Sequence, residues 1–127
     1  MIDRTPSASP AAVLAGTHPL LADRARLAIL VTLAAAPEPV DFTTLLGSLG
    51  LTRGNFATHA RRLEDARLLT VAKAFVGRRP RTTYAVTAEG RAAVRGYLEA
   101  VGSLLQTLAP PAPAGAPPVR RGRLTEG

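Results

Sequence analysis

The sequence contains no cysteine and no tryptophan, and its only two histidines, His18 and His59, stand far apart in the chain. Disulfides, thiolate metal sites and cysteine nucleophiles are therefore excluded. Two distant histidines also make a histidine-based zinc site or catalytic dyad a poor expectation. There is also no Ser-His-Asp set, no cluster of paired carboxylates and no glycine-rich phosphate loop, so an enzyme is not expected.

Long apolar runs are absent as well. No stretch of about 18 apolar residues free of charge occurs, so no membrane span is expected. The first residues, Met1 to Pro6, lack the basic-then-apolar order of a signal peptide. The expected location is the cytoplasm. With 127 residues the chain has room for one domain with one modest core.

Positive charge is present in excess and is concentrated in one part of the chain. The net charge is +7, and eight cations stand against two anions in the thirty residues from Thr52 to Arg81. Such a cluster indicates a polyanionic partner. Almost all of these cations are arginine, whose planar fork suits phosphate and guanine. Arginine, alanine and proline are abundant throughout, which a GC-rich genome would produce without a functional cause.

The segment from Leu51 to Glu64 has the pattern of a helix with two contrasting faces. Thr52 is a capping residue, and one apolar stripe recurs at helical spacing. That stripe consists of Phe56, Ala60 and Leu63. At about 100° per residue the opposite face is small, polar and cationic. It consists of Gly54, Thr58, Arg61 and Asp65, with Ala57 and Arg62 at its edges. A helix that lies in a DNA major groove needs such a face; an ordinary solvated face is the alternative.

The preceding part of the chain predicts the rest of a helix-turn-helix. Residues 1–17 are rich in Ser, Pro and Ala and predict a flexible arm with little structure. A broadly apolar helix is expected from His18-Pro19 to about Ala36. After a short extended piece at residues 40–42, a helix is expected over residues 44–49. Its candidate caps are Asp41 and Thr43, and Gly50 is its expected left-handed C-terminal residue.

A hairpin is expected next. Apolar and other residues alternate from Leu69 to Phe75, which predicts a strand. Residues 77–81 predict a basic turn, and residues 82–86 predict the returning strand. A β-hairpin with a basic tip beside a helix-turn-helix is a wing. Pro80 is expected to stiffen the tip of this wing.

The last helix is expected to begin after Thr87 and to carry a heptad seam. The seam consists of Val94, Leu98, Val101, Leu105 and Leu108. We expect it to pack on a second chain; the alternative is that it folds back on the first helix. Both hold if Leu20 and Leu27 of the first helix join the same dimer interface. Residues 109–127 are Pro-rich and then basic, and predict a flexible tail that is either solvated or in contact with phosphate.

These motifs, in this order, resemble the winged helix-turn-helix transcriptional regulators. Within them the chain is similar to the small one-domain group related to MarR-type and ArsR-type repressors. The resemblance rests on residues 41–45, 51–55 and 77–84 and covers residues 18–108. It implies a mainly α fold with a small β-hairpin (α+β) and a long C-terminal dimerisation helix. It also implies a homodimer that binds an inverted repeat in double-stranded DNA, usually as a repressor.

Two residues depart from the family pattern. Arg67 stands where the family usually has glycine, at a left-handed exit from the recognition helix. We therefore expect either a different exit or a strain of order 1 kcal/mol there. Ala57 replaces a polar residue and would remove one base contact. The metal ligands of metal-sensing ArsR-type members are also absent.

The resemblance places the DNA contacts on the recognition helix and the wing. The helix positions are Thr52, Arg53, Gly54, Asn55, Ala57, Thr58, His59 and Arg62, and the wing positions are Arg78, Arg79 and Arg81. The outward face of the same helix adds Arg61 to the candidate DNA contacts. Arg53 and Thr58 are assigned to base edges, and Asn55 either to a base or to the turn. His59 is favoured for packing or phosphate contact over base reading. Arg61 and Arg62 are assigned to phosphates, and the wing to the flanking backbone or minor groove.

No cofactor is expected. A small-molecule effector is left open, because Tyr97, Phe42 and the first-helix leucines suit either a ligand cleft or a core. One further alternative is a winged-helix protein-interaction module whose recognition face meets an acidic protein. The excess of arginine at both the helix and the wing favours DNA.

Overall fold

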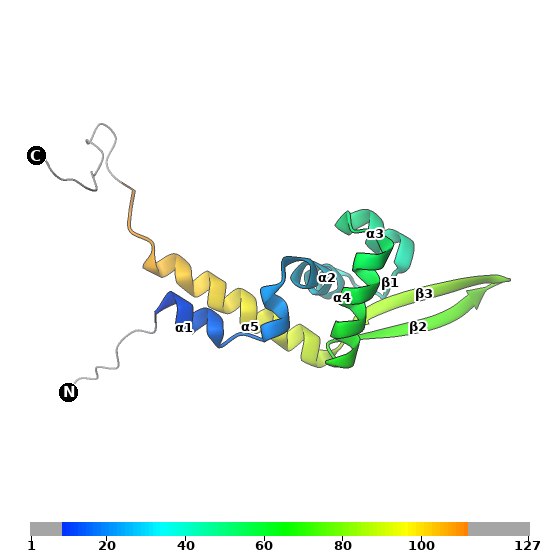
Figure 1. The fold of residues 1–127 in the computed structure, drawn as a ribbon, viewed down its shortest axis with the longest axis horizontal. Coiled ribbons are helices and arrows are strands. Elements are labelled where there is room, and N and C mark those ends of the chain that lie inside the picture. The colour runs from blue at the N-terminus through cyan, green and yellow to red at the C-terminus, as the bar shows by residue number, and fades with distance from the viewer. Residues whose placement is uncertain (1–8, 112–127) are drawn as a thin grey trace, which may run out of the picture.

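The computed structural model describes residues 9–111 and combines helices with a small antiparallel sheet (Figure 1). The elements are α1 (Pro10–Ala15), the 3₁₀ turn η1 (Pro19–Ala22), α2 (Arg24–Ala35), β1 (Val40–Asp41), α3 (Phe42–Leu49), α4 (Arg53–Asp65), β2 (Leu69–Val76), β3 (Arg79–Val86), α5 (Ala88–Leu104) and the 3₁₀ turn η2 (Leu105–Thr107). The predicted fold class, mainly α with a β-hairpin wing, is confirmed. Among the described residues, no helix has the length and apolarity needed to cross a membrane.

Side-chain caps fix where the central helices begin. The Thr52 hydroxyl accepts the Asn55 N–H at 3.1 Å, and the Thr87 hydroxyl accepts the Gly90 N–H at 2.8 Å. Of the two candidate caps for α3, Asp41 is the one used, and α3 ends at Gly50 with φ of 68°. These caps and the left-handed glycine were predicted, because each depends on residues close together in the chain.

The three strands pair in the order β1-β3-β2. The hairpin is paired along its length, from Leu69 with Val86 to Val76 with Arg79. The strand β1 is much shorter and pairs only with Thr83 and Tyr84. The outer half of the hairpin therefore has no third strand beside it, and it extends away from the helices (Figure 1).

The core joins the helix-turn-helix to the sheet around Phe56. Phe56 is fully buried, and its ring meets those of Phe42 and Tyr84 edge-on, at centroid distances of 5.6 and 5.1 Å. Ala60 and Leu63 are buried on the same side of α4. The predicted apolar stripe of this helix is thus confirmed, and its burial turns the opposite face of α4 outward.

The N-terminal part of the chain differs from expectation in two ways. Little structure was expected over residues 1–17, but Ser9 caps a short helix, α1, that packs against α5 (Figure 1); residues 1–8 lie outside the described residues. The expected single helix from residue 18 to 36 is also broken. Asp23 is extended, with φ of −85° and ψ of 126°, and its carboxylate accepts the Arg26 N–H. A 3₁₀ turn therefore precedes Asp23, and α2 begins after it.

The wing turn is shorter than the expected span of residues 77–81. Since Val76 pairs with Arg79, only Gly77 and Arg78 form the turn, and Gly77 has φ of 65°. Glycine at the first central position permits a two-residue hairpin turn. Pro80 consequently lies in β3 opposite Phe75, not at the tip. That part of β3 has no strand on the side away from β2. The N–H that Pro80 lacks would point to that side, so no hydrogen bond of the sheet is lost.

The last helix ends earlier than the heptad pattern suggests. The α-helix stops at Leu104, and the 3₁₀ turn η2 follows before Leu108. Arg67, after α4, has φ of 66°, so of the two alternatives the left-handed exit is the one observed. Of the expected flexible tail, residues 109–111 are described and the rest lies outside the described residues.

Candidate nucleic-acid interface

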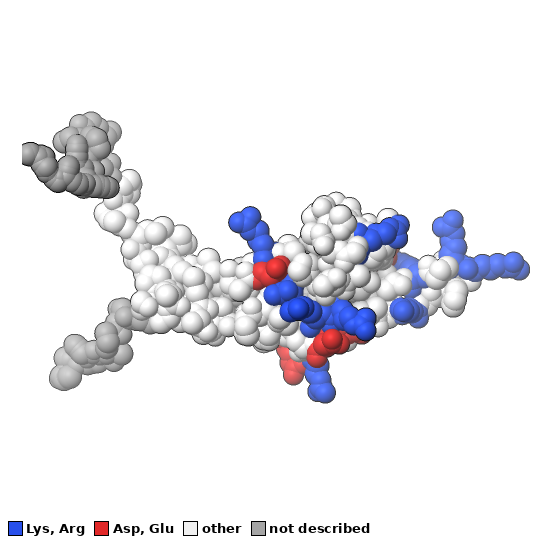
Figure 2. Space-filling view, viewed as in Figure 1, with Lys and Arg blue, Asp and Glu red and all other residues white. Residues whose placement is uncertain are grey.

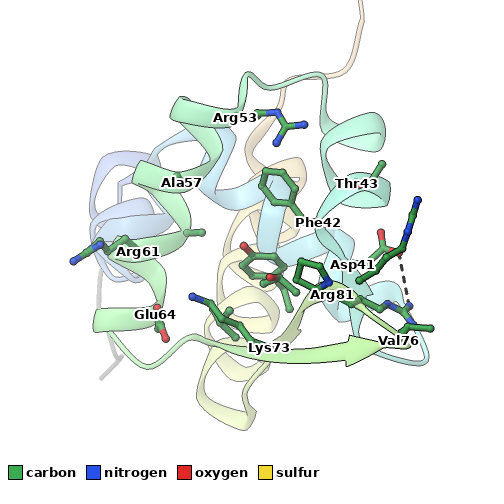
Figure 3. A pocket seen from close by; sticks show the side chains of 16 residues that line it. Asp41, Phe42, Thr43, Arg53, Ala57, Arg61, Glu64, Lys73, Val76 and Arg81 are labelled. Atoms are coloured by element: carbon green, nitrogen blue, oxygen red, sulfur yellow. Dashed lines mark ion pairs between the residues drawn. The ribbon is translucent and has the colours of Figure 1, made fainter.

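An open groove of about 1210 Å³ lies between α4, the start of α3 and the hairpin (Figure 3). Five cationic side chains line it against two carboxylates: Arg53, Arg61, Lys73, Arg79 and Arg81 face Asp41 and Glu64. Lys and Arg also gather on this half of the molecule in Figure 2, where they reach out to the end of the hairpin. The groove is therefore a basic, solvent-open concavity between two projecting elements.

The outer face of α4 has few bulky side chains. Gly54, Ala57 and Thr58 are exposed there, and a Cβ added at Gly54 would meet no atom within 4 Å. The Thr58 hydroxyl donates to the Gly54 carbonyl at 3.0 Å, which holds it close to the helix. A broad rigid surface can therefore approach the backbone of α4 closely.

Arg53 lies at one end of this groove. Its guanidinium carbon lies 5.4 Å from the centroid of the Phe42 ring, within cation–π range (Figure 3). Phe42 in turn packs on the buried Phe56. The first residue of α4 thus has a defined orientation while its charge stays exposed to solvent.

On the opposite wall, Asp41 connects α3 to the hairpin. Its Oδ1 accepts the Thr44 N–H at 2.8 Å, and its Oδ2 lies 3.7 Å from Nη2 of Arg81 (Figure 3). The hydrogen bonds from Thr44, with a smaller contribution from Arg81, lower the pKa of Asp41 below its ordinary value. The carboxylate form of Asp41 therefore holds Arg81 beside the groove at neutral pH.

Most residues that line the groove were not among the predicted site residues, and Thr43, Lys73 and Tyr84 are three of them. Thr43 and Lys73 line the groove, and Tyr84 lies deeper between them and the core. Burial raises the pKa of the Tyr84 phenol, and the Glu64 carboxylate raises it further. The signal for Lys73 was available in the sequence, because it alternates with Val71 along one strand and so shares its face.

Other predicted residues lie outside the groove. His59 faces α2, with Nε2 at 4.0 Å from Asp23 Oδ1 and Nδ1 at 3.4 Å from Arg26 Nη1. His59 therefore lies against side chains of α2 in its own chain. A hydrogen bond from the Arg26 backbone is the main cause that lowers the pKa of Asp23. The hydroxyl of Thr52 caps α4 by accepting the Asn55 N–H. Asn55, Arg62 and Arg78 are exposed but do not line the groove.

The seam of α5 divides into two parts. Val94 is only 5% exposed because it packs in the core of its own chain, so it offers little surface to a second chain. Leu20 and Leu27 are half-buried against the same core. The remaining members are exposed: Leu98 by 49%, Val101 by 38%, Leu105 by 67% and Leu108 by 68%. The free apolar surface therefore begins at Leu98.

A capped helix-turn-helix, a hairpin beside it and a basic groove between them define a winged helix-turn-helix protein. A family model described as "Winged helix DNA-binding domain" matches residues 25–105, and the chain belongs to this family. The resemblance to winged-helix transcriptional regulators is thereby confirmed.

Several solved structures share the fold. A transcriptional regulator homologue from Pyrococcus horikoshii OT3 is 26% identical, with a TM-score of 0.68 over 77% of this chain and 95% of that one. The PcaV transcriptional regulator from Streptomyces coelicolor, solved with its natural ligand, is 25% identical, with a TM-score of 0.58 over 67% of this chain and 59% of that one.

The fold alone is shared with more distant structures. The S. aureus MepR–DNA complex is 18% identical, with a TM-score of 0.60 over 70% of this chain and 75% of that one. PadR-like and MarR-like regulators are also among the structural neighbours. No curated protein matches the chain. Family and fold together assign the chain to the DNA-binding transcriptional regulators.

Proposed function

We propose that this chain is a sequence-specific transcriptional repressor that binds an inverted-repeat operator as a homodimer. The observation that carries the proposal is the groove between α4 and the wing, where five cations surround a helix face of small residues. A major groove of B-DNA admits one α-helix, provided that the helix face allows close approach.

The residues of α4 divide into two roles. Arg53 and Thr58 contact base edges, and Asn55 contacts either a base or the turn. Arg61 and Arg62 bind phosphates on either side of the helix. The cation–π contact with Phe42 supports the role of Arg53, because an oriented guanidinium loses less freedom when it binds guanine.

The wing supplies flanking contacts. Arg79 and Arg81 line the groove, and Arg78 is exposed in the turn between the two strands. Their guanidinium groups bind the DNA backbone or enter the minor groove beside the recognition site. Lys73, which faces α4 across the groove, adds a phosphate contact.

The dimer follows from the exposed side of α5. Leu98, Val101, Leu105 and Leu108 present a row of apolar side chains to solvent, and such a row is typical of an interface. A two-fold dimer places two recognition helices on two half-sites that mirror each other, which requires an inverted repeat. Occupation of that operator is expected to repress the adjacent gene.

Binding to the DNA upstream of the chain's own gene tests the proposal. We would titrate the full chain against a fluorescent duplex by anisotropy, across a salt series and against random competitor. The expected result is two protomers per site, a steep salt slope and a large ratio of specific to random affinity. Equal affinity for operator and random DNA at every salt concentration would contradict sequence-specific binding.

Two substitutions separate the roles of the helix and the wing. Arg53→Ala should cost roughly 1–3 kcal/mol on the operator and relax its sequence preference. Arg79→Ala should weaken all sequences alike and lower the salt slope by about one. Arg24→Ala removes an exposed arginine that does not line the groove and is the charge-matched control. If both groove variants behave alike on operator and random DNA, the role assignment is wrong.

A further inference from the structure

One aromatic side chain stands outside the core. The chain has three phenylalanines; Phe42 and Phe56 pack together, whereas Phe75 in β2 is 72% exposed. Its neighbour Val76 is 58% exposed. Burial of an exposed phenylalanine is favourable, so a partner that covers Phe75 gains free energy.

Strand pairing restrains the backbone at Phe75. Phe75 pairs across the strands with Pro80, whose ring fixes its φ, and a two-residue turn at Gly77 closes the hairpin. No third strand covers this part, since β1 reaches only Thr83 and Tyr84. Phe75 is therefore an exposed side chain on a paired part of the hairpin, and the hairpin extends away from the helices (Figure 1).

The charge around Phe75 selects the kind of partner. From Leu69 to Val86 the hairpin carries four cations and no acidic residue; the cations are Lys73, Arg78, Arg79 and Arg81. An apolar side chain among cations fits a surface that is anionic outside and apolar within. The DNA minor groove, with phosphate edges around stacked bases, is such a surface.

The position of the wing favours DNA over other anionic surfaces. Arg79 and Arg81 line the same groove as Arg53 and Arg61 of α4. A duplex that lies against α4 therefore continues toward the end of the hairpin, where Phe75 and Val76 lie.

We propose that Phe75, supported by Pro80, is a wedge that enters the minor groove beside the operator and partly unstacks one base step. This inference rests on the proposed function, since the same duplex must lie on α4. Pyrimidine–purine steps such as TA or CA unstack most easily. The wedge therefore makes the protein prefer operators with a flexible flanking step. This preference arises without any hydrogen bond to a base at that step.

Unstacking is measured with 2-aminopurine, whose fluorescence rises when it leaves the stack. We would place it in turn at each flanking position of the operator duplex and bind the full chain. Wild type should raise the fluorescence at one flanking step of each half-site, because each protomer carries one Phe75. Phe75→Ala should abolish the rise and weaken operator binding about tenfold, with the salt slope unchanged because no charge is lost.

Two variants serve as controls. Thr70→Ala removes an exposed side chain near the base of the same strand and should keep both the fluorescence rise and the affinity. Arg79→Ala should lower the salt slope by about one while the rise persists at saturation. The contrast assigns unstacking to the ring and not to the general charge or fold of the wing.

The outcomes separate this inference from the proposed function. Specific operator binding with equal fluorescence for wild type and Phe75→Ala overturns the wedge alone. Failure of wild type to prefer the operator overturns the proposed function as well. If Phe75→Ala leaves the DNA signals unchanged but reduces binding to phosphatidylserine–phosphatidylcholine vesicles, the wedge is overturned in favour of a membrane contact.

Discussion

Arg67 occupies a backbone conformation that suits glycine better. Its φ of 66° is the only positive value at a non-glycine residue in the described part of the chain. The left-handed conformation costs an L-residue roughly 1–2 kcal/mol. Arg67→Gly should therefore raise the free energy of unfolding by about 1 kcal/mol, measured by urea denaturation. The matched variant Arg62→Gly, inside α4, should lower it by a similar amount; equal signs for the two variants would rule out strain at Arg67.

Gly90 allows α5 to pack closely against the backbone at Leu68. A Cβ at this position would lie 2.0 Å from the Leu68 carbonyl oxygen and 2.8 Å from Cγ2 of Val86. Since backbone cannot move aside cheaply, Gly90→Ala should destabilise the fold by about 3 kcal/mol. Gly96 of the same helix has nothing within 4 Å of its Cβ position. Gly96→Ala should stabilise by up to about 1 kcal/mol, and thermal unfolding of both variants gives the comparison.

At this scale the sequence predicts local contacts and misses distant ones. The Thr52 cap joins residues three apart and could be predicted. The contact of Arg53 with Phe42 and that of Arg81 with Asp41 join different elements, so no sequence spacing predicts them. His59 was placed near the buried edge of its helix by periodicity, but its neighbours Asp23 and Arg26 appear only when α2 is positioned.

Among the elements, α4 could be predicted most fully because its apolar stripe and cap agree. The hairpin was predicted with the wrong turn: Gly77 and Arg78 suffice, and Pro80 lies in a strand. The basic composition of residues 77–81 suggested a longer loop, whereas turn length depends on the backbone conformation at Gly77. The break before α2 was missed because Asp23 is equally suited to a helix's first turn and to its cap.

The cap of α3 makes one part of the fold depend on pH. Because the folded state lowers the pKa of Asp41, its contribution is fully present above the unfolded pKa of about 3.9 and is lost as pH falls through the lower folded value. The stability difference between wild type and Asp41→Ala should be largest near neutral pH and shrink below about pH 4. Urea unfolding from pH 7 to 3 measures it, with Asp65→Ala as an exposed-carboxylate control. A difference that stays constant over this range would exclude the ionised cap as its source.

For the whole molecule, charge and apolar surface lie at different ends. The cations surround the groove and wing. The exposed apolar side chains lie in the C-terminal half of α5 and just after it, and α1 runs beside this end of α5 (Figure 1). The heptad spacing predicted that surface, but it could not show where the chain's own core ends, which is at Val94. This separation lets one end meet a second chain while the other stays open to DNA.

Disruption of the α5 surface should therefore separate the protomers. Leu98→Gln with Leu105→Gln removes two exposed leucines from each chain without changing its net charge. The dimer dissociation constant should rise by at least about 100-fold, since four apolar side chains leave the interface. Sedimentation equilibrium measures this change.

The same variant connects assembly to operator binding. A monomer engages one half-site at a time, so the double variant should lose specific affinity for the inverted repeat while weak binding to random DNA persists. Phe75→Gln, which removes an equally exposed apolar side chain from the wing, should leave the protomers associated. If the double variant remains dimeric, or if wild type is monomeric at micromolar concentration, the exposed leucines of α5 do not form the interface. The two recognition helices would then have to be brought together by another surface.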